Sequence, residues 1–220
     1  MTGGGALSAT RIDVPADISS AAFFMVAAAI TPDSDIILPH VGINPTRIGV
    51  INILRQMGAQ LSLSNEREVG GEPVADIRIQ YGELKGIEIP VDQVPLAIDE
   101  FPVLFIAAAC AEGTTILTGA EELRVKESDR IQSMADGLVT LGIDAQATAD
   151  GIVIVGGELG GGRVLSHHDH RIAMAFAIAG LRAKGEITVE GCNNVATSFP
   201  NFINSAAAIG LNIQVETHHD

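Results

Sequence analysis

Hydrophobic and polar residues follow one pattern along this chain, and the pattern recurs three times. Each copy holds a helix that is apolar on almost every side, a short strand, a second helix with a single apolar stripe, and further strand-like residues. The apolar helices are predicted in the segments "AAFFMVAAAI", "PVLFIAAACA" and "IAMAFAIAGL". Because a helix without a polar face must be enclosed by protein, we expect these three helices to lie parallel at the centre of the molecule.

The second helix of each copy is expected on the outside, because only one of its faces is apolar. In the second copy this stripe consists of Ile131, Met134, Leu138 and Leu141. Short strands before the outer helices are predicted at residues 35–38, 114–117 and 186–189. Each outer helix ends at a glycine, which suits a left-handed helix C-cap. These glycines are Gly58, Gly142 and Gly210.

The sequence therefore predicts an α/β (α+β) fold of three βαβαββ units in a pseudo-threefold arrangement, with buried helices surrounded by sheets and outer helices. The units are expected at about residues 9–82, 83–157 and 158–220, after a flexible leader at residues 1–8. The last unit is incomplete, because nothing after the strand expected from Leu211 to Glu216 corresponds to "DIRIQ" and "GIVIVGG" in the other units. Since sheets rarely leave a long edge open, we expect an upstream segment of a longer polypeptide to supply the absent strand.

Composition narrows the function. A hydrophobic content of 47% supports a substantial core, and a formal net charge of -14 argues against the broad basic face that binds nucleic acid. The longest apolar run, Ala21 to Ile30, is too short to cross a bilayer, so no membrane partner is expected. Cys110 and Cys192 each stand alone, which suggests neither a disulfide framework nor a zinc site. A reducing cytoplasm fits this cysteine usage best.

The stretch "LRVKESDRI" gathers three cations, Arg124, Lys126 and Arg130, in an acidic chain. The residues from Glu127 to Asp129 are expected in the first turn of a helix. One interpretation is an ordinary surface pair between Glu127 and Arg130, which lie three residues apart. The other is that Lys126 and Arg130 bind an anion at a helix N-terminus, with Glu127 as a proton donor or acceptor.

The stretch "HHDHRIAMAF" places Arg171 at the start of the third buried helix, where the helix dipole disfavours a cation unless an anion lies nearby. Its three histidines and one aspartate suggest a metal site, but neighbours in sequence project in different directions and no second ligand cluster is visible. We therefore expect no metal. The better alternative is that the histidines form local hydrogen bonds and orient the loop that presents Arg171.

Asp99 and Glu100, in "IDEFPVLF", precede the second buried helix and could simply act as N-caps. The repeat also gives Asp17, Asp99 and Arg171 comparable positions at the entrances of the three central helices, so that they could share one surface. Two other stretches are assigned structural roles only. "NPTR" at 44–47 is expected as an Asn N-cap with Pro at the first helical position, and "GGELGGG" at 156–162 as a turn or loop.

The motifs "DISSAAFFMVAAAI", "GINPTRIGV", "LRVKESDRI", "DHRIAMAF" and "TSFPNF" together resemble those of the 5-enolpyruvylshikimate-3-phosphate synthase family. The resemblance covers nearly the whole chain and corresponds to the C-terminal part of a two-domain enzyme whose active site lies between the domains. It implies that the upstream domain, and the strand that crosses from it, are missing here. Alternatives are an enzyme like the UDP-N-acetylglucosamine enolpyruvyl transferase, which lacks the "KESDR" and "DHR" motifs, and a non-catalytic scaffold module of a larger fused polypeptide.

The resemblance implies transfer of the enolpyruvyl group from phosphoenolpyruvate to the 5-hydroxyl of shikimate 3-phosphate, without a cofactor. Arg130 and Arg171 would bind phosphoenolpyruvate, and Lys126 and Asp99 would contact shikimate 3-phosphate. Asp99 would also act as the base toward the 5-hydroxyl, and Glu127 would handle the proton at the methylene carbon. Thr197 stands where some family members carry a lysine, so one anion contact departs from the pattern. We expect the isolated chain to be inactive as a synthase.

Overall fold

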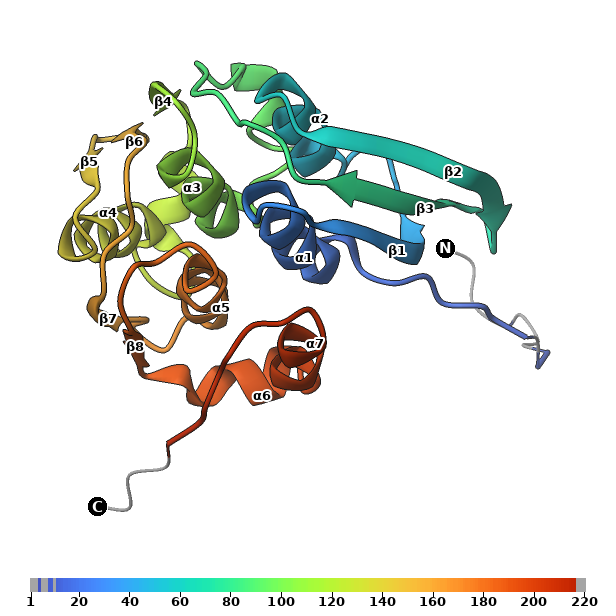
Figure 1. The fold of residues 1–220 in the computed structure, drawn as a ribbon. Coiled ribbons are helices and arrows are strands. Elements are labelled where there is room, and N and C mark those ends of the chain that lie inside the picture. The colour runs from blue at the N-terminus through green and yellow to red at the C-terminus, as the bar shows by residue number, and fades with distance from the viewer. Residues whose placement is uncertain (1–3, 5–7, 10, 217–220) are drawn as a thin grey trace.

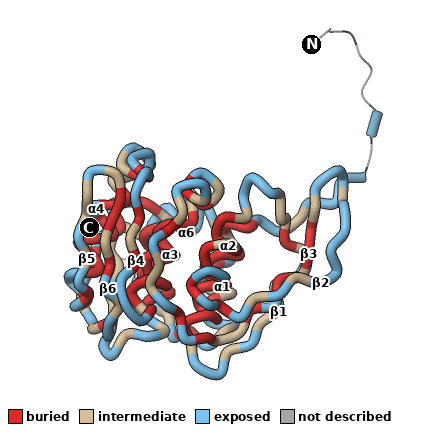
Figure 2. Tube along the Cα trace, turned by 90° about the horizontal axis from the view of Figure 1, so that it is seen from above, coloured by how far each residue is buried: buried red, intermediate tan, exposed pale blue. Residues whose placement is uncertain are grey.

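Three helices lie side by side at the centre of the computed structural model, which describes residues 4, 8–9 and 11–216 (Figure 1). They are α1 (Ile18–Ile30), α3 (Phe101–Ala109) and α5 (His170–Ala179). Every residue of α3 and most residues of α1 are buried, as the tube in Figure 2 makes visible, and most residues of α5 are buried too. The prediction of three enclosed helices is confirmed. Most of the predicted leader at residues 1–8 lies outside the described residues.

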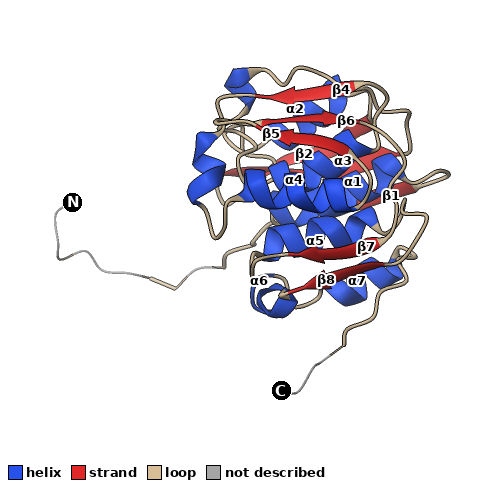
Figure 3. Cartoon of the chain, turned by 90° about the vertical axis from the view of Figure 1, so that its left-hand side faces the viewer, coloured by secondary structure: helices blue, strands red, loops and turns tan. Residues whose placement is uncertain are grey.

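Three separate sheets surround these helices, one for each repeat (Figures 1 and 3). The strands are β1 (Asp35–Gly42), β2 (Gln60–Val69), β3 (Glu72–Gln80), β4 (Thr114–Leu117), β5 (Asp144–Ala147), β6 (Ile152–Val155), β7 (Gly162–Leu165) and β8 (Ile187–Glu190). The first two sheets are antiparallel, with strand orders β1-β3-β2 and β4-β6-β5. The third contains only β7 and β8, which pair in parallel.

A short extended segment precedes each of the first two buried helices and replaces a full strand. Ala16 bridges Val41 in parallel, and Lys85 and Glu88 bridge Glu112 and Ile116 in the same way. The bridges of Ala16 and Glu88 join the segment before a buried helix to the strand after it, and that of Lys85 reaches Glu112 just ahead of β4; β7 and β8 stand in the same relation. The three copies therefore share this part of the topology, from the segment before the buried helix to the strand after it.

The outer helices cover the core with one face each. They are α2 (Gly49–Gln56), α4 (Arg130–Thr140) and α7 (Phe202–Ala208), with the short α6 (Val195–Ser198) before α7. The predicted stripe from Ile131 to Leu141 is at most 1% exposed at each of its four positions. Gly58, Gly142 and Gly210 have φ angles of 94°, 87° and 95°, so the left-handed C-cap conformation is confirmed.

The third unit differs from the prediction, because residues 211–216 form no strand. In the first two sheets the last strand of the unit lies between the other two, as β3 does between β1 and β2. The third unit has no equivalent of β3 or β6 within the described residues. Residues 211–216 consequently lack a neighbouring strand to bond with, and a strand-like sequence without a partner stays irregular.

Two helix starts also differ from the prediction. Glu127 and Ser128 lie in a bend, and α4 begins only at Arg130, after an N-cap formed by Asp129. In "NPTR", residues 45–48 form a turn instead of the first helical turn. The Asn44 side chain accepts a hydrogen bond from the Thr46 amide at 3.0 Å, so it stabilises this turn ahead of α2. Among the described helices, none is long and apolar enough to cross a membrane.

Candidate active site

The N-terminal ends of the three buried helices meet at one surface, and the Asp99 carboxylate lies within it. Its Oδ1 atom is 3.7 Å from Lys126 Nζ and 3.4 Å from Arg130 Nη1. Its Oδ2 atom is 3.9 Å from Arg171 Nη2. The structure thus brings together four of the five residues proposed from the sequence for catalysis and binding, contributed by two repeat units. Three cations converge on this one carboxylate, so their donors are gathered where an anionic ligand could bind.

Asp169 holds the side chain of Arg130 and the backbone of Arg171, whereas the sequence analysis considered it only as the aspartate of a possible metal site. Arg130 Nε donates to Asp169 Oδ2 at 2.8 Å, and both side chains are almost completely buried. As the N-cap of α5, Asp169 also accepts a hydrogen bond from the Arg171 amide at 2.9 Å. Ser128 donates to the same carboxylate at 3.2 Å. An aspartate directly before a buried helix was the available signal, but a capping role alone explains that pattern.

Glu127, the fifth proposed residue, lies beside the cluster. Its Oε2 atom is 2.8 Å from His170 Nδ1, whereas its Oε1 atom is 3.9 Å from Arg130 Nη2. The closer partner of Glu127 is therefore His170, and the closer partner of Arg130 is Asp169. The pair expected between Glu127 and Arg130 is present at 3.9 Å, but it is not an ordinary surface pair, because the Arg130 side chain is buried. With its side chain 45% exposed, Glu127 can reach a molecule bound at this surface.

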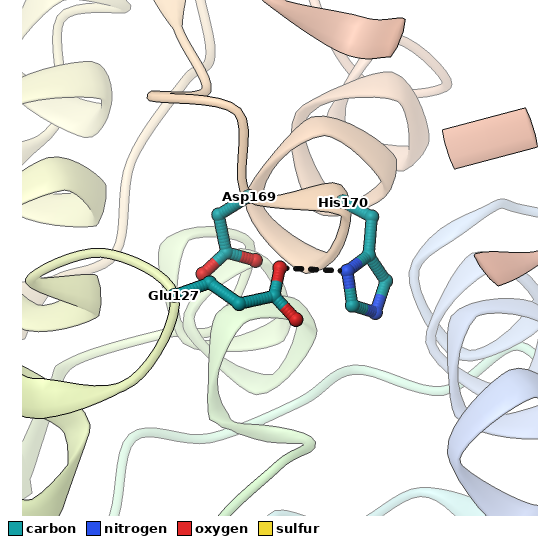
Figure 4. Close-up of side chains that lie close together, drawn as sticks. All are labelled: Glu127, Asp169 and His170. Carbon is teal, nitrogen blue, oxygen red and sulfur yellow. Dashed lines mark hydrogen bonds and ion pairs between the residues drawn. The ribbon is translucent and has the colours of Figure 1, made fainter. Parts of the chain in front are cut away.

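A possible metal-ligand group exists at the same place, although the sequence suggested no second ligand cluster. Ligand atoms of Glu127, Asp169 and His170 all lie within 4.8 Å of one another (Figure 4). However, Asp169 already bonds to the Arg130 guanidinium, the Ser128 hydroxyl and a helix amide. A metal ion would have to compete with this buried guanidinium for the carboxylate. The donor set is therefore better suited to orienting cations than to holding a metal.

Unit one contributes Arg47, which sequence reasoning assigned to structure only. Arg47 Nη2 donates to Ser19 Oγ at 2.6 Å and lies 3.5 Å from Asp17 Oδ1. Asp17 in turn caps α1 by accepting a hydrogen bond from the Ser20 amide at 2.9 Å. The signal that could have found Arg47 is its place in the repeat, because it precedes the outer helix α2 much as Arg130 begins the outer helix α4.

Glu100 is the N-cap residue of α3, but its side chain makes no capping hydrogen bond. Instead, it is buried and accepts a hydrogen bond from the Ser19 hydroxyl. Burial raises the pKa of Glu100, and the Ser19 hydrogen bond and the charge of Arg171 partly oppose this rise. Glu100 therefore occupies the N-cap position, but the expected capping by its side chain is wrong.

Arg124 and Thr197, which the sequence analysis also named, form no hydrogen bond or ion pair with Asp99, Lys126, Arg130 or Arg171 in the structure. Arg124 bonds to Asp129 at 2.6 Å and to the Ala149 carbonyl at 2.8 Å, so it ties the bend before α4 to the hairpin of β5 and β6. Thr197 is exposed in α6. Asn194 donates to the His168 carbonyl at 2.5 Å, which fastens the loop that leads into α5.

Comparison with known proteins identifies the family. A family model described as EPSP synthase (3-phosphoshikimate 1-carboxyvinyltransferase) matches residues 1–205. The chain belongs to the EPSP synthase family. A 3-phosphoshikimate 1-carboxyvinyltransferase from Methylococcus capsulatus is 70% identical over 212 residues, and the match covers 96% of this chain and 48% of that protein. The same enzyme from Nitrosococcus oceani is 66% identical with the same coverage.

Solved structures agree with this assignment. An EPSP synthase from Acinetobacter baumannii matches with a TM-score of 0.95 and 62% identity, covering 99% of this chain and 51% of the other. The enolpyruvyl transferase NikO from Streptomyces tendae has a TM-score of 0.67 at 16% identity over 92% of this chain and 44% of its own, so it shares the fold alone. The comparisons thus support the EPSP synthase family, which the motifs had favoured over an enzyme like the UDP-N-acetylglucosamine enolpyruvyl transferase. The chain spans about half the length of the curated relatives it matches.

Proposed function

We propose that this chain forms the C-terminal half of an EPSP synthase, which transfers the enolpyruvyl group of phosphoenolpyruvate to shikimate 3-phosphate in aromatic amino acid biosynthesis. The observation that carries the proposal is the convergence of Asp99, Lys126, Arg130 and Arg171 on one surface at the entrances of the buried helices. The names of the relatives point to the same reaction. The reaction requires no cofactor, and its substrates are those of a cytoplasmic biosynthetic enzyme.

The cations serve to bring two polyanions together. Phosphoenolpyruvate and shikimate 3-phosphate repel one another, and this repulsion is strongest where water is excluded. Arg130 and Arg171 bind phosphoenolpyruvate, and Lys126 together with Asp99 contacts shikimate 3-phosphate. The Arg130 side chain is only 3% exposed, so its charge acts in a low-dielectric surrounding and is screened less than a surface charge.

The two carboxylates carry the proton transfers. Asp99 removes the proton from the 5-hydroxyl as that oxygen bonds to C2 of phosphoenolpyruvate, while Glu127 delivers a proton to the methylene carbon C3. The resulting tetrahedral intermediate then expels phosphate from C2. Glu127 takes a proton back from C3, and the double bond of the enol ether forms again. The hydrogen bond to His170 at 2.8 Å holds the Glu127 carboxylate in place for both steps.

The other half of the active site comes from the missing N-terminal domain of the same polypeptide. That domain faces the surface around Asp99 and also supplies the strand absent from the third sheet. The isolated chain is accordingly expected to release no measurable phosphate from the two substrates. Adding the remaining half of the Methylococcus capsulatus relative as a separate polypeptide should restore release. Turnover by the chain alone at a modest fraction of ordinary enzyme rates would contradict the proposal.

Ligand binding separates this proposal from a scaffold role. The chain should bind phosphoenolpyruvate weakly in isothermal titration calorimetry, and Arg171→Ala should abolish the binding. Arg78→Ala provides the control, because Arg78 pairs with Asp35 in the first sheet and not with the site. A scaffold module would show no binding in any of the three proteins.

A further inference from the structure

Glu100 connects all three repeat units beneath the proposed substrate surface. The residue lies directly before α3 of unit two, and its side chain is only 3% exposed. The hydroxyl of Ser19, on α1 of unit one, donates to Glu100 Oε1. Arg171 Nη1, on α5 of unit three, lies 3.9 Å from the same oxygen. Neither the binding nor the proton transfers proposed above use this carboxyl group.

The connection extends from Arg47 to Arg171. Arg47 Nη2 donates to Ser19 Oγ at 2.6 Å, and that hydroxyl then has its own proton free for Glu100. On the other side, Arg171 Nη1 also donates to the backbone carbonyl of Asp99 at 3.0 Å. One edge of the Arg171 guanidinium is therefore held by two consecutive residues of unit two, Asp99 and Glu100.

A buried acid at this position is costly. The other residues of this helix start are apolar, and burial raises the pKa of Glu100, which means that its charged form is disfavoured there. The neighbouring groups that act on this carboxyl are Ser19, Arg171, Asp99 and Arg47. An ionisable group kept in such surroundings beside a cluster of cations is typical of a functional site.

We propose that Glu100 is a positioning residue that fixes the Arg171 guanidinium in the orientation that receives the anionic end of phosphoenolpyruvate. This inference rests on the function proposed above for Arg171. An arginine side chain loses rotamer freedom when it binds a ligand, so a guanidinium that is already held binds more tightly. Ser19 supports the arrangement by holding the Glu100 carboxyl from the side of unit one.

The first test measures the mobility of Arg171 and needs no substrate. The 15N relaxation of the Arg171 Nε group is compared in this chain and in its Glu100→Gln and Ser19→Ala variants. Both substitutions should lower the order parameter of Arg171 Nε, with the larger change in Glu100→Gln. Glu158→Gln is the matched control, because it removes a carboxylate paired with Lys184 at 2.6 Å on the surface. An Arg171 that stays equally ordered in Glu100→Gln overturns the inference.

The second test measures affinity for phosphoenolpyruvate by calorimetry. Glu100→Gln removes a negative charge beside Arg171, so a purely electrostatic effect would tighten anion binding. Positioning predicts the opposite, a loss of about three- to tenfold. In an Arg171→Lys background, which keeps the positive charge but has no guanidinium to orient, Glu100→Gln should cause little further loss, whereas a general structural role would lower affinity in both backgrounds. Tighter binding in Glu100→Gln, or equal losses in both backgrounds, overturns the inference.

The two proposals can fail separately. If the wild-type chain binds no phosphoenolpyruvate, the binding role proposed for Arg171 fails, and the order parameter of Arg171 Nε still decides whether Glu100 holds it. If binding occurs and Glu100→Gln changes neither the affinity nor the order parameter of Arg171 Nε, the proposed function is retained and the positioning role of Glu100 is wrong.

Discussion

The charged residues of the site differ sharply in their surroundings. Arg130 and Asp169 form a buried pair, whereas Lys126 and Glu127 keep more exposed side chains at the edge of the cluster. The buried pair fixes the geometry, because a charge without water depends entirely on its partners. Lys126 pairs with Glu122 and Glu127 with His170, but both side chains stay accessible enough to meet a ligand. A buried pair that fixes the geometry, with more accessible charged groups beside it, is the arrangement that pre-organised binding requires.

Removal of the Asp169 charge should strongly destabilise the protein. In Asp169→Asn the N-cap of α5 is retained, since Asn caps as well as Asp, but the buried Arg130 loses its closest and, among the described residues, only buried charged partner. It keeps the more distant carboxylates of Asp99 and Glu127. We expect a loss of about 3–5 kcal/mol in the free energy of unfolding, measured with urea. The exposed-pair control Glu158→Gln should lose less than about 1 kcal/mol. Similar losses in the two variants would show that Arg130 does not depend on Asp169.

Glu100 should make stability depend on pH. Its pKa is raised above the ordinary value of 4.5, chiefly by burial, so its contribution to stability is complete below the ordinary value and is lost as pH rises through the raised one. The free energy of unfolding of the wild type, measured with urea, should therefore fall relative to that of Glu100→Gln as pH rises from about 4 to about 8. The lowered pKa values of Asp35 and Asp76, which arise first from hydrogen bonds to Arg78 and Asn65, are common to both proteins and cancel. A difference that is constant with pH would refute the prediction.

At the scale of elements, the central helices pack closely and leave little space for change. The apolar faces of α1, α3 and α5 are rich in alanine, which lets their backbones approach. The outer helix α4 comes close to α5 at Gly137, which faces the ring of the fully buried Phe176. A substituted Cβ at Gly137 would lie 2.2 Å from Phe176 Cζ, far inside contact distance.

Gly137→Ala should therefore destabilise the protein even though alanine is the better helix former. The helix propensity gain is about 1 kcal/mol, but overpacking typically costs about 1–3 kcal/mol. Because the added Cβ would lie so far inside contact distance, we expect the upper end of this cost and a net loss of up to about 2 kcal/mol in the free energy of unfolding, measured with urea. Phe176→Leu in the same protein makes room, so the double variant should lose less than the sum of the two single changes. Additive losses would mean that the ring moves aside without cost.

At the scale of the whole molecule, the third sheet is the unfinished part. Its two strands contrast with three in each of the other sheets, and the chain spans about half the length of its curated relatives. Within the described residues, no strand pairs with the second edge of β8. An unpaired edge offers free amides and carbonyls to an incoming strand.

If the proposed N-terminal half supplies the third strand, its addition should protect this edge. Amide hydrogen exchange of β8 residues 187–190 should be fast in the isolated chain at the positions that do not bond to β7, and should slow on addition of the remaining half of the Methylococcus capsulatus relative. The inner strand β6, which is already paired on both sides, serves as the internal control and should not change. Unchanged exchange in β8 would show that no segment of the other half pairs there.

Periodicity alone determined the elements whose formation is local. The buried helices, the stripe of α4 and the left-handed glycines were predicted correctly, because each depends on hydrogen bonds and apolar contacts within a few residues. The strand expected at 211–216 was wrong, since a strand forms only against a neighbour. The start of α4 was placed too early because the Asp129 side chain accepts a hydrogen bond from the Gln132 amide and so caps the helix just before Arg130, which hydrophobic periodicity does not reveal.

The motifs also nominated Asp99, Lys126, Arg130 and Arg171, because unusual charges stood at helix entrances in an acidic, apolar chain. Only the tertiary structure revealed what holds them. Arg130 and Asp169 are 39 residues apart in sequence, and Ser19 and Glu100 are 81 residues apart. No local pattern encodes such pairs, since they exist only after the three units have packed their helices together. The sequence determined which residues carry charge, and the packing decided which charges are buried, paired and held in place.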